Sequence, residues 1–310
     1  GQSKYLLSEA CEYKNNFLVF NPNLAVITNI ESEHLDYFKN LAGIKKSFRK
    51  FVGQIRKGGW LVVNGDNKNA SELKKYYSGQ TLTFGIKNKA DFQATEVQIG
   101  RDGLTQFKLK TGKKFGNYNN KIFELSVPGE FNIYNALGAI ASAAVLGVGP
   151  EVTVKALAQF DGVWRRFEFK GKTKSGIEIY DDYGHHPTEI RATLAAAKEK
   201  FKARKIWVVF QPHLYSRTKD FMSEFAAALN LADNIIVVDI YAAREINKYK
   251  ISSRDVVDLI NKKYWREKPA VYIPTFDKAV EYLKKNLKKG EVVMTMGAGE
   301  AYKVGEELLG

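Results

Sequence analysis

The sequence predicts an α/β protein of two domains: a mixed sheet with additional antiparallel strands over residues 1–162, then a doubly wound parallel sheet over residues 163–310. Its 310 residues, 45% of them hydrophobic, suffice for two packed cores. The second half alternates apolar runs with helix-like stretches, which is typical of parallel α/β sheets. Strands are expected there at residues 177–180, 205–210, 234–239, 270–273 and 291–295.

The first half is less regular. Apolar runs predict strands at residues 4–8 and 24–30, and the spacing of large apolar residues predicts an amphipathic helix over 38–55. A strand at 60–63 leads into the turn Asn64-Gly65-Asp66 and a helix through Tyr77. From residue 81 to 127, alternating strands predict an antiparallel sheet, broken at Arg101-Asp102-Gly103 and at 111–113.

Acidic residues follow the first two expected strands. The first strand ends at Glu9 and Glu12, and the second ends at Glu31, Glu33 and His34. Carboxylates and an imidazole at adjacent strand ends can hold Mg²⁺ directly or through water. His34 alone could equally be a helix-start residue ahead of Leu35.

A small-residue helix is expected over residues 137–146, opened by the segment 128–136. Asn132 and Asn135 are three residues apart, so both amides face one side of the helix start and could bind a base or phosphate. Asn132 could instead be an N-cap. A second helix, 151–160, ends at Asp161-Gly162, which is taken as the domain boundary.

Arg165 and Arg166 follow this boundary directly. Guanidinium groups bind phosphate with two hydrogen bonds and stay charged, so two arginines at an interdomain hinge are suited to clamp phosphates. The alternative, for whichever arginine points outward, is a surface ion pair with Glu168.

The densest polar stretch is residues 180–190, Tyr-Asp-Asp-Tyr-Gly-His-His-Pro-Thr-Glu-Ile. It lies where a strand ends and a helix beginning at Pro187 follows, and ligands of open α/β sheets bind at the carboxyl ends of strands. A polar turn that caps the helix is the alternative. Three further strand ends carry polar or glycine-rich segments that could converge on the same ligand, at residues 211–218, 239–245 and 296–301.

Other function classes find less support. The net charge of +14 is spread along amphipathic segments with no nucleic-acid-binding motif, so it favours an anionic substrate over nucleic acid. The single cysteine, Cys11, excludes an internal disulfide. No secretion signal is apparent, and the longest apolar run, near 136–148, is too short for a membrane span. Gly171-Lys172-Thr173 is not a P-loop, because Arg166 stands at the required glycine.

The motifs at residues 29–36, 128–136, 162–168, 180–189 and 210–218 resemble those of the Mur ligases of bacterial peptidoglycan synthesis. The last two, with 239–241 and 296–299, look most like the branch that adds L-alanine to UDP-N-acetylmuramate. The resemblance implies the later part of a central ATPase domain followed by a Rossmann-like C-terminal domain.

The resemblance also implies a cytoplasmic, ATP-dependent amide ligase that works through an acyl phosphate, with UDP-N-acetylmuramate and L-alanine as substrates. Neither nucleic acid nor a membrane is expected as a partner, and no oligomeric state is predicted. The implied roles are Mg²⁺ binding by Glu9 or Glu12 with His34, adenine contact by Asn132 and Asn135, ATP-phosphate contact by Arg166, ribose contact by Asp182, and binding of the muramate or alanine carboxylate by His185, His213 and Arg217.

The sequence departs from the family pattern in two ways. Phe131 stands where many relatives have His, and Leu214 where a basic or polar residue is common. The family's nucleotide-sugar-binding domain and P-loop do not precede residues 4–8, and the chain begins with Gly1, so a fragment that is inactive alone is expected. The alternatives are a ligase that attaches a recovered tripeptide to UDP-N-acetylmuramate and a non-catalytic nucleotide or nucleic-acid binder.

Overall fold

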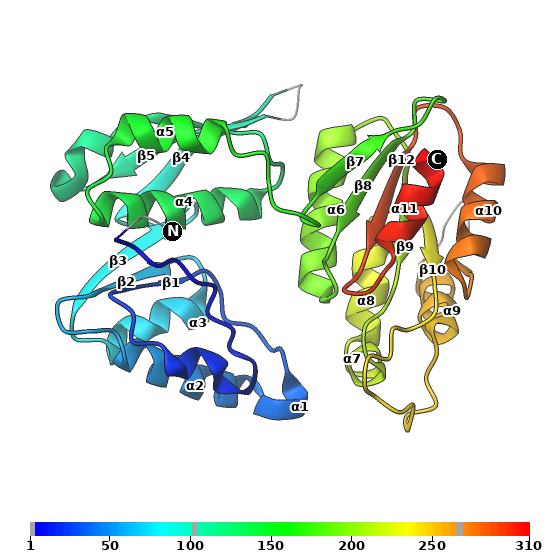
Figure 1. The fold of residues 1–310 in the computed structure, drawn as a ribbon, viewed down its shortest axis with the longest axis horizontal. Coiled ribbons are helices and arrows are strands. Elements are labelled where there is room, and N and C mark those ends of the chain that lie inside the picture. Colours follow the sequence, from blue (N-terminus) through cyan, green and yellow to red (C-terminus); the bar gives the residue numbers. More distant parts are fainter. Residues whose placement is uncertain (1–3, 101–103, 265–268) are drawn as a thin grey trace. The chain divides into compact units, whose positions relative to one another are not determined.

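The computed structural model describes residues 4–100, 104–264 and 269–310, and it divides the chain into two compact units (Figure 1). Unit 1 comprises most of the first 160 residues, and unit 2 comprises residues 126–130 and 161–310. The change after Phe160 lies close to the boundary expected at residue 162. The turn expected at residues 101–103 and the first residue, Gly1, lie outside the described residues.

The sheet of unit 1 follows chain order. Among the described residues its strands are β1 (Leu24–Ile27), β2 (Trp60–Asn64), β3 (Gln80–Gly85), β4 (Phe92–Ile99), β5 (Thr105–Thr111) and β6 (Ile122–Leu125). Strands β1 to β4 run parallel, and β4 to β6 run antiparallel. The predicted mixed sheet is confirmed, but the antiparallel part begins only at β4. Alternation of apolar residues marks a strand and does not reveal the direction of its neighbour.

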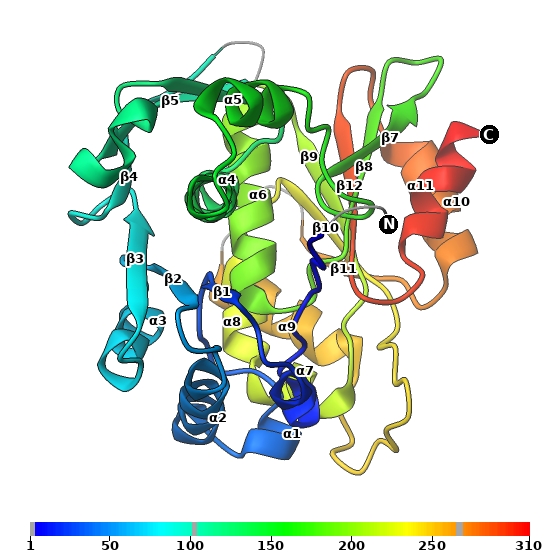
Figure 2. The same ribbon diagram turned by 60° about the vertical axis from the view of Figure 1, so that its left-hand side comes forward.

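Helices cover both faces of this sheet (Figure 2). On β1, Ala25 and Ile27 share a core cluster with Phe51 of α2, whereas Val26 lies against Gly138 of α4. Because successive side chains of a strand alternate, α2 and α4 pack on opposite faces. The helical elements of unit 1 are η1 (Tyr13–Val19), α1 (Leu35–Phe38), α2 (Leu41–Gly53), α3 (Lys68–Ser71), η2 (Glu72–Tyr76), η3 (Lys113–Tyr118), α4 (Glu130–Val145) and α5 (Pro150–Ala158).

The strand predicted at residues 4–8 is wrong. This segment belongs to no ladder, and its Leu6 and Leu7 are 91% and 97% exposed. A strand requires a neighbour for its backbone N–H and C=O groups. Within the described residues, β1 pairs with β2 on one side, and no further strand joins its other side. An apolar run without a partner strand stays irregular.

Unit 2 confirms the predicted doubly wound sheet. Its order is β11-β10-β9-β12-β8-β7, in which β7 alone runs antiparallel, at one edge. The strands are β7 (Glu168–Lys172), β8 (Glu178–Asp182), β9 (Ile206–Phe210), β10 (Asn234–Val237), β11 (Val271–Tyr272) and β12 (Val292–Met296). Strand β7 was not among the expected parallel strands.

Helices lie on both faces of this second sheet (Figure 1). One face carries α6 (Pro187–Phe201), α8 (Met222–Leu229) and α9 (Ser253–Lys263), and the other carries α10 (Phe276–Asn286) and α11 (Tyr302–Leu309). The chain leaves β9 through α7 (Tyr215–Asp220) toward β10, but it leaves β12 through α11, which packs on β8. The chain therefore diverges between β9 and β12, the point where open α/β sheets bind ligands.

No helix among the described residues combines the length and the apolar character that crossing a bilayer requires.

Candidate functional site

Two histidines meet at the carboxyl edge of the unit 2 sheet. His185 follows β8 and His213 follows β9, and their ring centroids are 5.6 Å apart. Tyr241, in the segment after β10, stacks on His213 with a centroid distance of 5.7 Å, and the two residues also form a parallel β-bridge. The segment after β12 reaches the same edge, since the backbone N–H of Glu300 donates to the side-chain oxygen of Gln211, so all four loops expected to converge do so.

Arg217 gives this edge its positive charge. The Nη1 group of Arg217 donates to Nδ1 of His213 at 3.0 Å, so the hydrogen of the neutral imidazole lies on Nε2. Burial, followed by the charge of Arg217, lowers the pKa of His213 to about 4. At neutral pH the pair therefore combines one fixed positive charge with a neutral N–H donor, which suits a carboxylate ligand. Leu214, between the two, has a strained φ of 69°.

His185 is held by its own turn. Its Nδ1 lies 3.1 Å from the carbonyl oxygen of Tyr183, and its backbone N–H donates to Glu189 at 2.9 Å. Burial alone would raise the pKa of Glu189. The charge of His185 and the backbone N–H groups of His185 and His186 have the larger combined effect, so the pKa of Glu189 is lowered. Nδ1 of His186 accepts from Thr188 N–H, so His186 caps α6, and Pro187 begins that helix as predicted. The alternative interpretation of residues 180–190, a polar turn that caps the helix, is therefore confirmed for His186.

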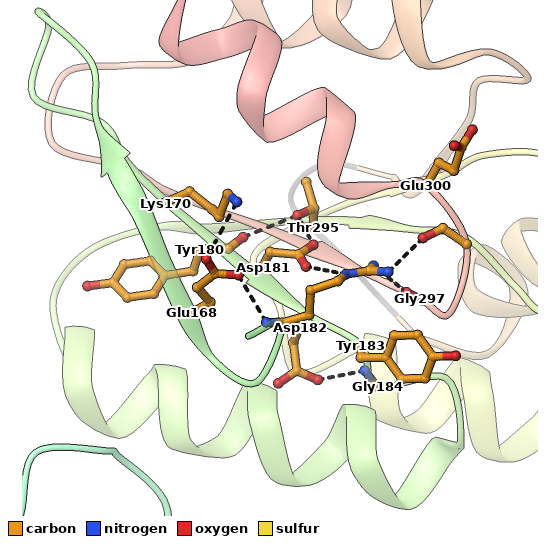
Figure 3. Close-up of polar contacts among 12 residues, drawn as sticks. Glu168, Lys170, Tyr180, Asp181, Asp182, Tyr183, Gly184, Thr295, Gly297 and Glu300 are labelled. Atoms are coloured by element: carbon orange, nitrogen blue, oxygen red, sulfur yellow. Dashed lines mark hydrogen bonds and ion pairs between the residues drawn. The ribbon is translucent and has the colours of Figure 1, made fainter. Parts of the chain in front are cut away.

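Asp182 orders the turn between β8 and α6. The residue is 3% exposed, and one of its oxygens accepts from the N–H of Gly184 at 2.7 Å (Figure 3). Its other oxygen accepts from the N–H of Phe167 at 2.9 Å. Burial raises its pKa to about 6 despite these bonds. A Cβ at Gly184 would lie 2.6 Å from Asp182 Oδ1, so the turn requires glycine. The ribose contact of Asp182 stays a prediction.

The two neighbouring arginines have different surroundings. The side chain of Arg166 is 50% exposed, with Nη1 3.3 Å from Glu189. Arg165 is 4% exposed, and its guanidinium binds Asp181 and two backbone carbonyl groups. The expectation that both arginines clamp phosphates is therefore wrong for Arg165. Arg166 is the arginine that points outward, and its ion pair is with Glu189 instead of the Glu168 that was expected. Glu168 accepts instead from the backbone N–H of Arg165.

Unit 1 carries a separate cluster of metal-ligand type. One ligand atom from each of Glu12, Glu33 and His34 lies within 4.8 Å of the others. Nε2 of His34 is 3.3 Å from Glu12, and this hydrogen bond outweighs burial and lowers the pKa of Glu12. Two carboxylates and an imidazole fit a divalent cation. Glu9 is not in this cluster, whereas Glu33, which precedes His34 in the sequence, joins it.

The two asparagines of α4 lie on one side of its first turn, as expected. Asn135 Nδ2 donates to Asn132 Oδ1 at 3.2 Å, and both amides are at the surface. The helix begins at Glu130, so Asn132 lies inside it, and the alternative of an N-cap is wrong. Phe131, the departure from the family pattern, is half-buried beside them.

Sequence reasoning missed Gln211. This residue follows β9, and its side-chain oxygen accepts from the N–H of Glu300 at 3.1 Å, which joins the segment after β12 to the His213 loop. Its place directly after a strand was the available signal.

Comparison with known proteins fits this fold and site. Residues 2–143 match the family model described as Mur ligase middle domain, and residues 165–299 match Mur ligase, glutamate ligase domain. The chain belongs to the Mur ligase family. It is 45% identical over 309 residues to the UDP-N-acetylmuramate–L-alanine ligase of Caldanaerobacter subterraneus subsp. tengcongensis, a match that covers 100% of this chain and 65% of that protein. The ligase of the same name from Alkaliphilus metalliredigens is 43% identical over 310 residues, with the same coverage. The chain thus spans about 65% of the length of these curated relatives.

Solved structures of Mur ligases have the same fold as this chain. The crystal structure of UDP-N-acetylmuramate-alanine ligase MurC from Thermotoga maritima matches with a TM-score of 0.75 and 27% identity, covering 95% of this chain and 60% of that one. The MurF ligase of Thermotoga maritima in complex with ADP has a TM-score of 0.73 at 19% identity, covering 95% of this chain and 64% of that one, and it shows the common fold alone.

Proposed function

We propose that the protein containing this chain is a cytoplasmic ATP-dependent amide ligase that joins L-alanine to UDP-N-acetylmuramate in peptidoglycan synthesis. One observation carries the proposal. His185, His213 and Arg217 gather at the switch point of the unit 2 sheet, in a chain 45% identical to a ligase of that name.

The unit 2 residues are suited to orient the carboxylate of a substrate. Arg217 supplies a permanent charge in a buried position, and His213 supplies a neutral N–H donor beside it. We assign His185 to the same task, because its turn is fixed by Glu189. None of the three is required to exchange a proton in this role.

In the proposed reaction, ATP phosphorylates the muramate carboxylate, and the amine of L-alanine attacks the acyl phosphate and expels phosphate. Arg166 is half exposed and would bind the ATP phosphates, with Asp182 at the ribose and Asn132 and Asn135 at the adenine. Glu12 and His34, now with Glu33, would hold Mg²⁺, which when bound supplies charge that neutralises phosphate oxygens. Phosphoryl transfer depends on such positioning and charge stabilisation.

Release of phosphate tests the proposal. With ATP and Mg²⁺, the protein containing this chain should release phosphate only when both UDP-N-acetylmuramate and L-alanine are present. Phosphate release with the tripeptide in place of L-alanine would identify the recycling ligase instead.

A variant of Arg166 sharpens this test. Arg166→Lys should lower kcat by roughly 10²-fold, the usual loss when a charge-stabilising donor is removed. Arg191→Lys is the matched control, because Arg191 is an exposed arginine of α6. Equal rates for the two variants would contradict the role of Arg166.

A further inference from the structure

Arg165 fastens together three segments of unit 2. Its Nε donates to Asp181 at 2.7 Å, its Nη1 to the carbonyl oxygen of Gly299 at 2.9 Å, and its Nη2 to that of Gly297 at 2.7 Å. The other oxygen of Asp181 accepts from the hydroxyl of Thr295 at 2.5 Å (Figure 3). One buried guanidinium thus ties the end of β8 to the end of β12 and to the glycine segment 297–299.

The glycine segment leads to His213. A Cβ at Gly299 would lie 2.1 Å from the side-chain oxygen of Gln211 and 3.3 Å from Cγ of Tyr241, so segment and neighbours are in close contact. Tyr241 stacks in turn on His213. A displacement of residues 297–299 toward these neighbours would therefore push on Tyr241, which stacks on the imidazole of His213.

A second route leads to His185. The carbonyl oxygen of Arg165 accepts from the N–H of Tyr183 at 2.6 Å, and its guanidinium lies 5.1 Å from the centre of the Tyr183 ring. The same ring lies 5.3 Å from that of His185. Arg165 holds these contacts with a φ of 56°, a conformation that a non-glycine residue keeps only when its surroundings enforce it.

We propose that Arg165 is a positioning residue of the unit 2 site: without touching substrate, it fixes His213 through the glycine segment and His185 through Tyr183. The proposal rests on the proposed function only in taking these histidines as substrate-orienting groups.

Arg204 offers a matched control at the opposite end of the same strands. It donates to the carbonyl oxygens of Gly290, at 2.5 Å, and Glu291, at 3.3 Å, ahead of β12, and it pairs with Glu178, at 3.0 Å, at the start of β8. Both arginines therefore join a carboxylate of β8 to two carbonyl groups flanking β12. Only Arg165 does so at the end that carries the histidines.

The histidine ring signals in NMR spectra of the 310-residue chain test the proposal, because the chain has 4 histidines in all. Arg165→Lys keeps the charge but loses the forked geometry. It should shift the ring signals of His213 and His185 by more than their linewidths and leave that of His34, in unit 1, in place. Arg204→Lys should lower the urea midpoint of unit 2 without shifting either signal.

Gly299→Ala keeps the proposal testable if Arg165→Lys does not fold. Its added methyl group presses on Gln211 and Tyr241 and should shift the signal of His213 more than that of His185. The proposal is overturned if Arg165→Lys folds with both signals unmoved, if Arg204→Lys shifts them equally, or if Gly299→Ala leaves His213 unmoved. These signals do not depend on which reaction is catalysed, so a failed ligase assay would not be mistaken for failure of this inference.

Discussion

The two candidate sites are built in different ways. In unit 1, the side chains of Glu12 and His34 are 31% and 25% exposed, and they lie on segments that flank short helices. In unit 2, the side chains of Arg165 and Asp181, which support the histidines, are 5% and 0% exposed. Buried polar networks fix geometry before a ligand arrives. The unit 2 site is therefore preorganised by buried contacts, whereas the Glu12, Glu33 and His34 cluster of unit 1, whose ligand atoms already lie within 4.8 Å of one another, is only partly shielded from solvent.

The comparison predicts that removing a supporting residue costs far more in unit 2. Arg165→Met should destabilise unit 2 by about 3–5 kcal/mol, because Asp181 is left buried without its partner. His34→Ala should destabilise unit 1 by less than about 1 kcal/mol, since its ion pair is partly exposed. Urea denaturation followed by NMR signals of each unit measures both. Similar losses would remove the distinction between the sites.

A double variant separates charge burial from packing. Adding Asp181→Leu to Arg165→Met should recover part of the lost stability, because no buried charge then remains unpaired.

The second-largest effect concerns the glycine segment. Gly297→Ala should cost about 1–3 kcal/mol, because φ is 137° and the new Cβ would lie 2.6 Å from the carbonyl oxygen of Gln211. Gly290→Ala is the control, with a φ of 81° and no atom within 4 Å of its Cβ position. If both variants lose the same stability, backbone strain alone accounts for it, and the close approach to Gln211 contributes nothing.

A pH dependence of unit 2 follows from His213. Because its folded-state pKa is lowered from 6.5 to about 4, the unfolded chain binds more protons between these values, and stability rises with pH across that window. Urea denaturation at pH 4.5 and pH 7.5 should show that wild type gains about 1–2 kcal/mol more than His213→Gln, allowing for partial exposure. Asp182 contributes a pH dependence of the opposite sign, because burial raises its folded-state pKa and its stabilising effect is lost as the pH rises. Since Asp182 is present in both proteins, its contribution cancels in the comparison. Equal gains for the two proteins would show that His213 titrates normally.

The smallest effect on stability is expected at the unit 1 cluster. Glu12→Gln should change unfolding by less than about 1 kcal/mol, yet weaken Mg²⁺ binding by roughly tenfold or more. The His34 ring signal during a Mg²⁺ titration reports the affinity. Glu9→Gln is the control and should bind as wild type does, because Glu9 lies outside the cluster. A tenfold loss in Glu9→Gln as well would show that the cluster is not the cation site.

Much of the fold could be predicted because its signals are local. Each parallel strand of unit 2 combines an apolar run with a following helix, so β8 to β12 were expected close to where they lie. The segment 4–8 has the same apolar run but no ladder, and pairing depends on residues distant in sequence.

The candidate site was predictable only in part. The rule that ligands bind at strand ends brought out the segments 180–190 and 211–218, and the resemblance to the Mur ligases then singled out His185, His213 and Arg217 within them. The rule could not separate Arg165 from Arg166, because the left-handed conformations of Arg165 and Phe167, which the sequence does not reveal, accompany one buried and one half-exposed guanidinium. The strand-end rule also could not show that Glu33 lies close to Glu12, because that distance depends on the conformations of two loops that are far apart in sequence.

The place of β12 also bears on the order in which the chain folds. Strand β12, near the end of the chain, lies between β8 and β9, so these two cannot complete the sheet until residue 296 has left the ribosome. The strands of unit 1 are neighbours in chain order and can pair as they emerge. We therefore expect a chain ending at Asn286 to retain a folded unit 1 and to expose the amides of β8 and β9 to hydrogen exchange. Protection of those amides in the shortened chain would refute this order.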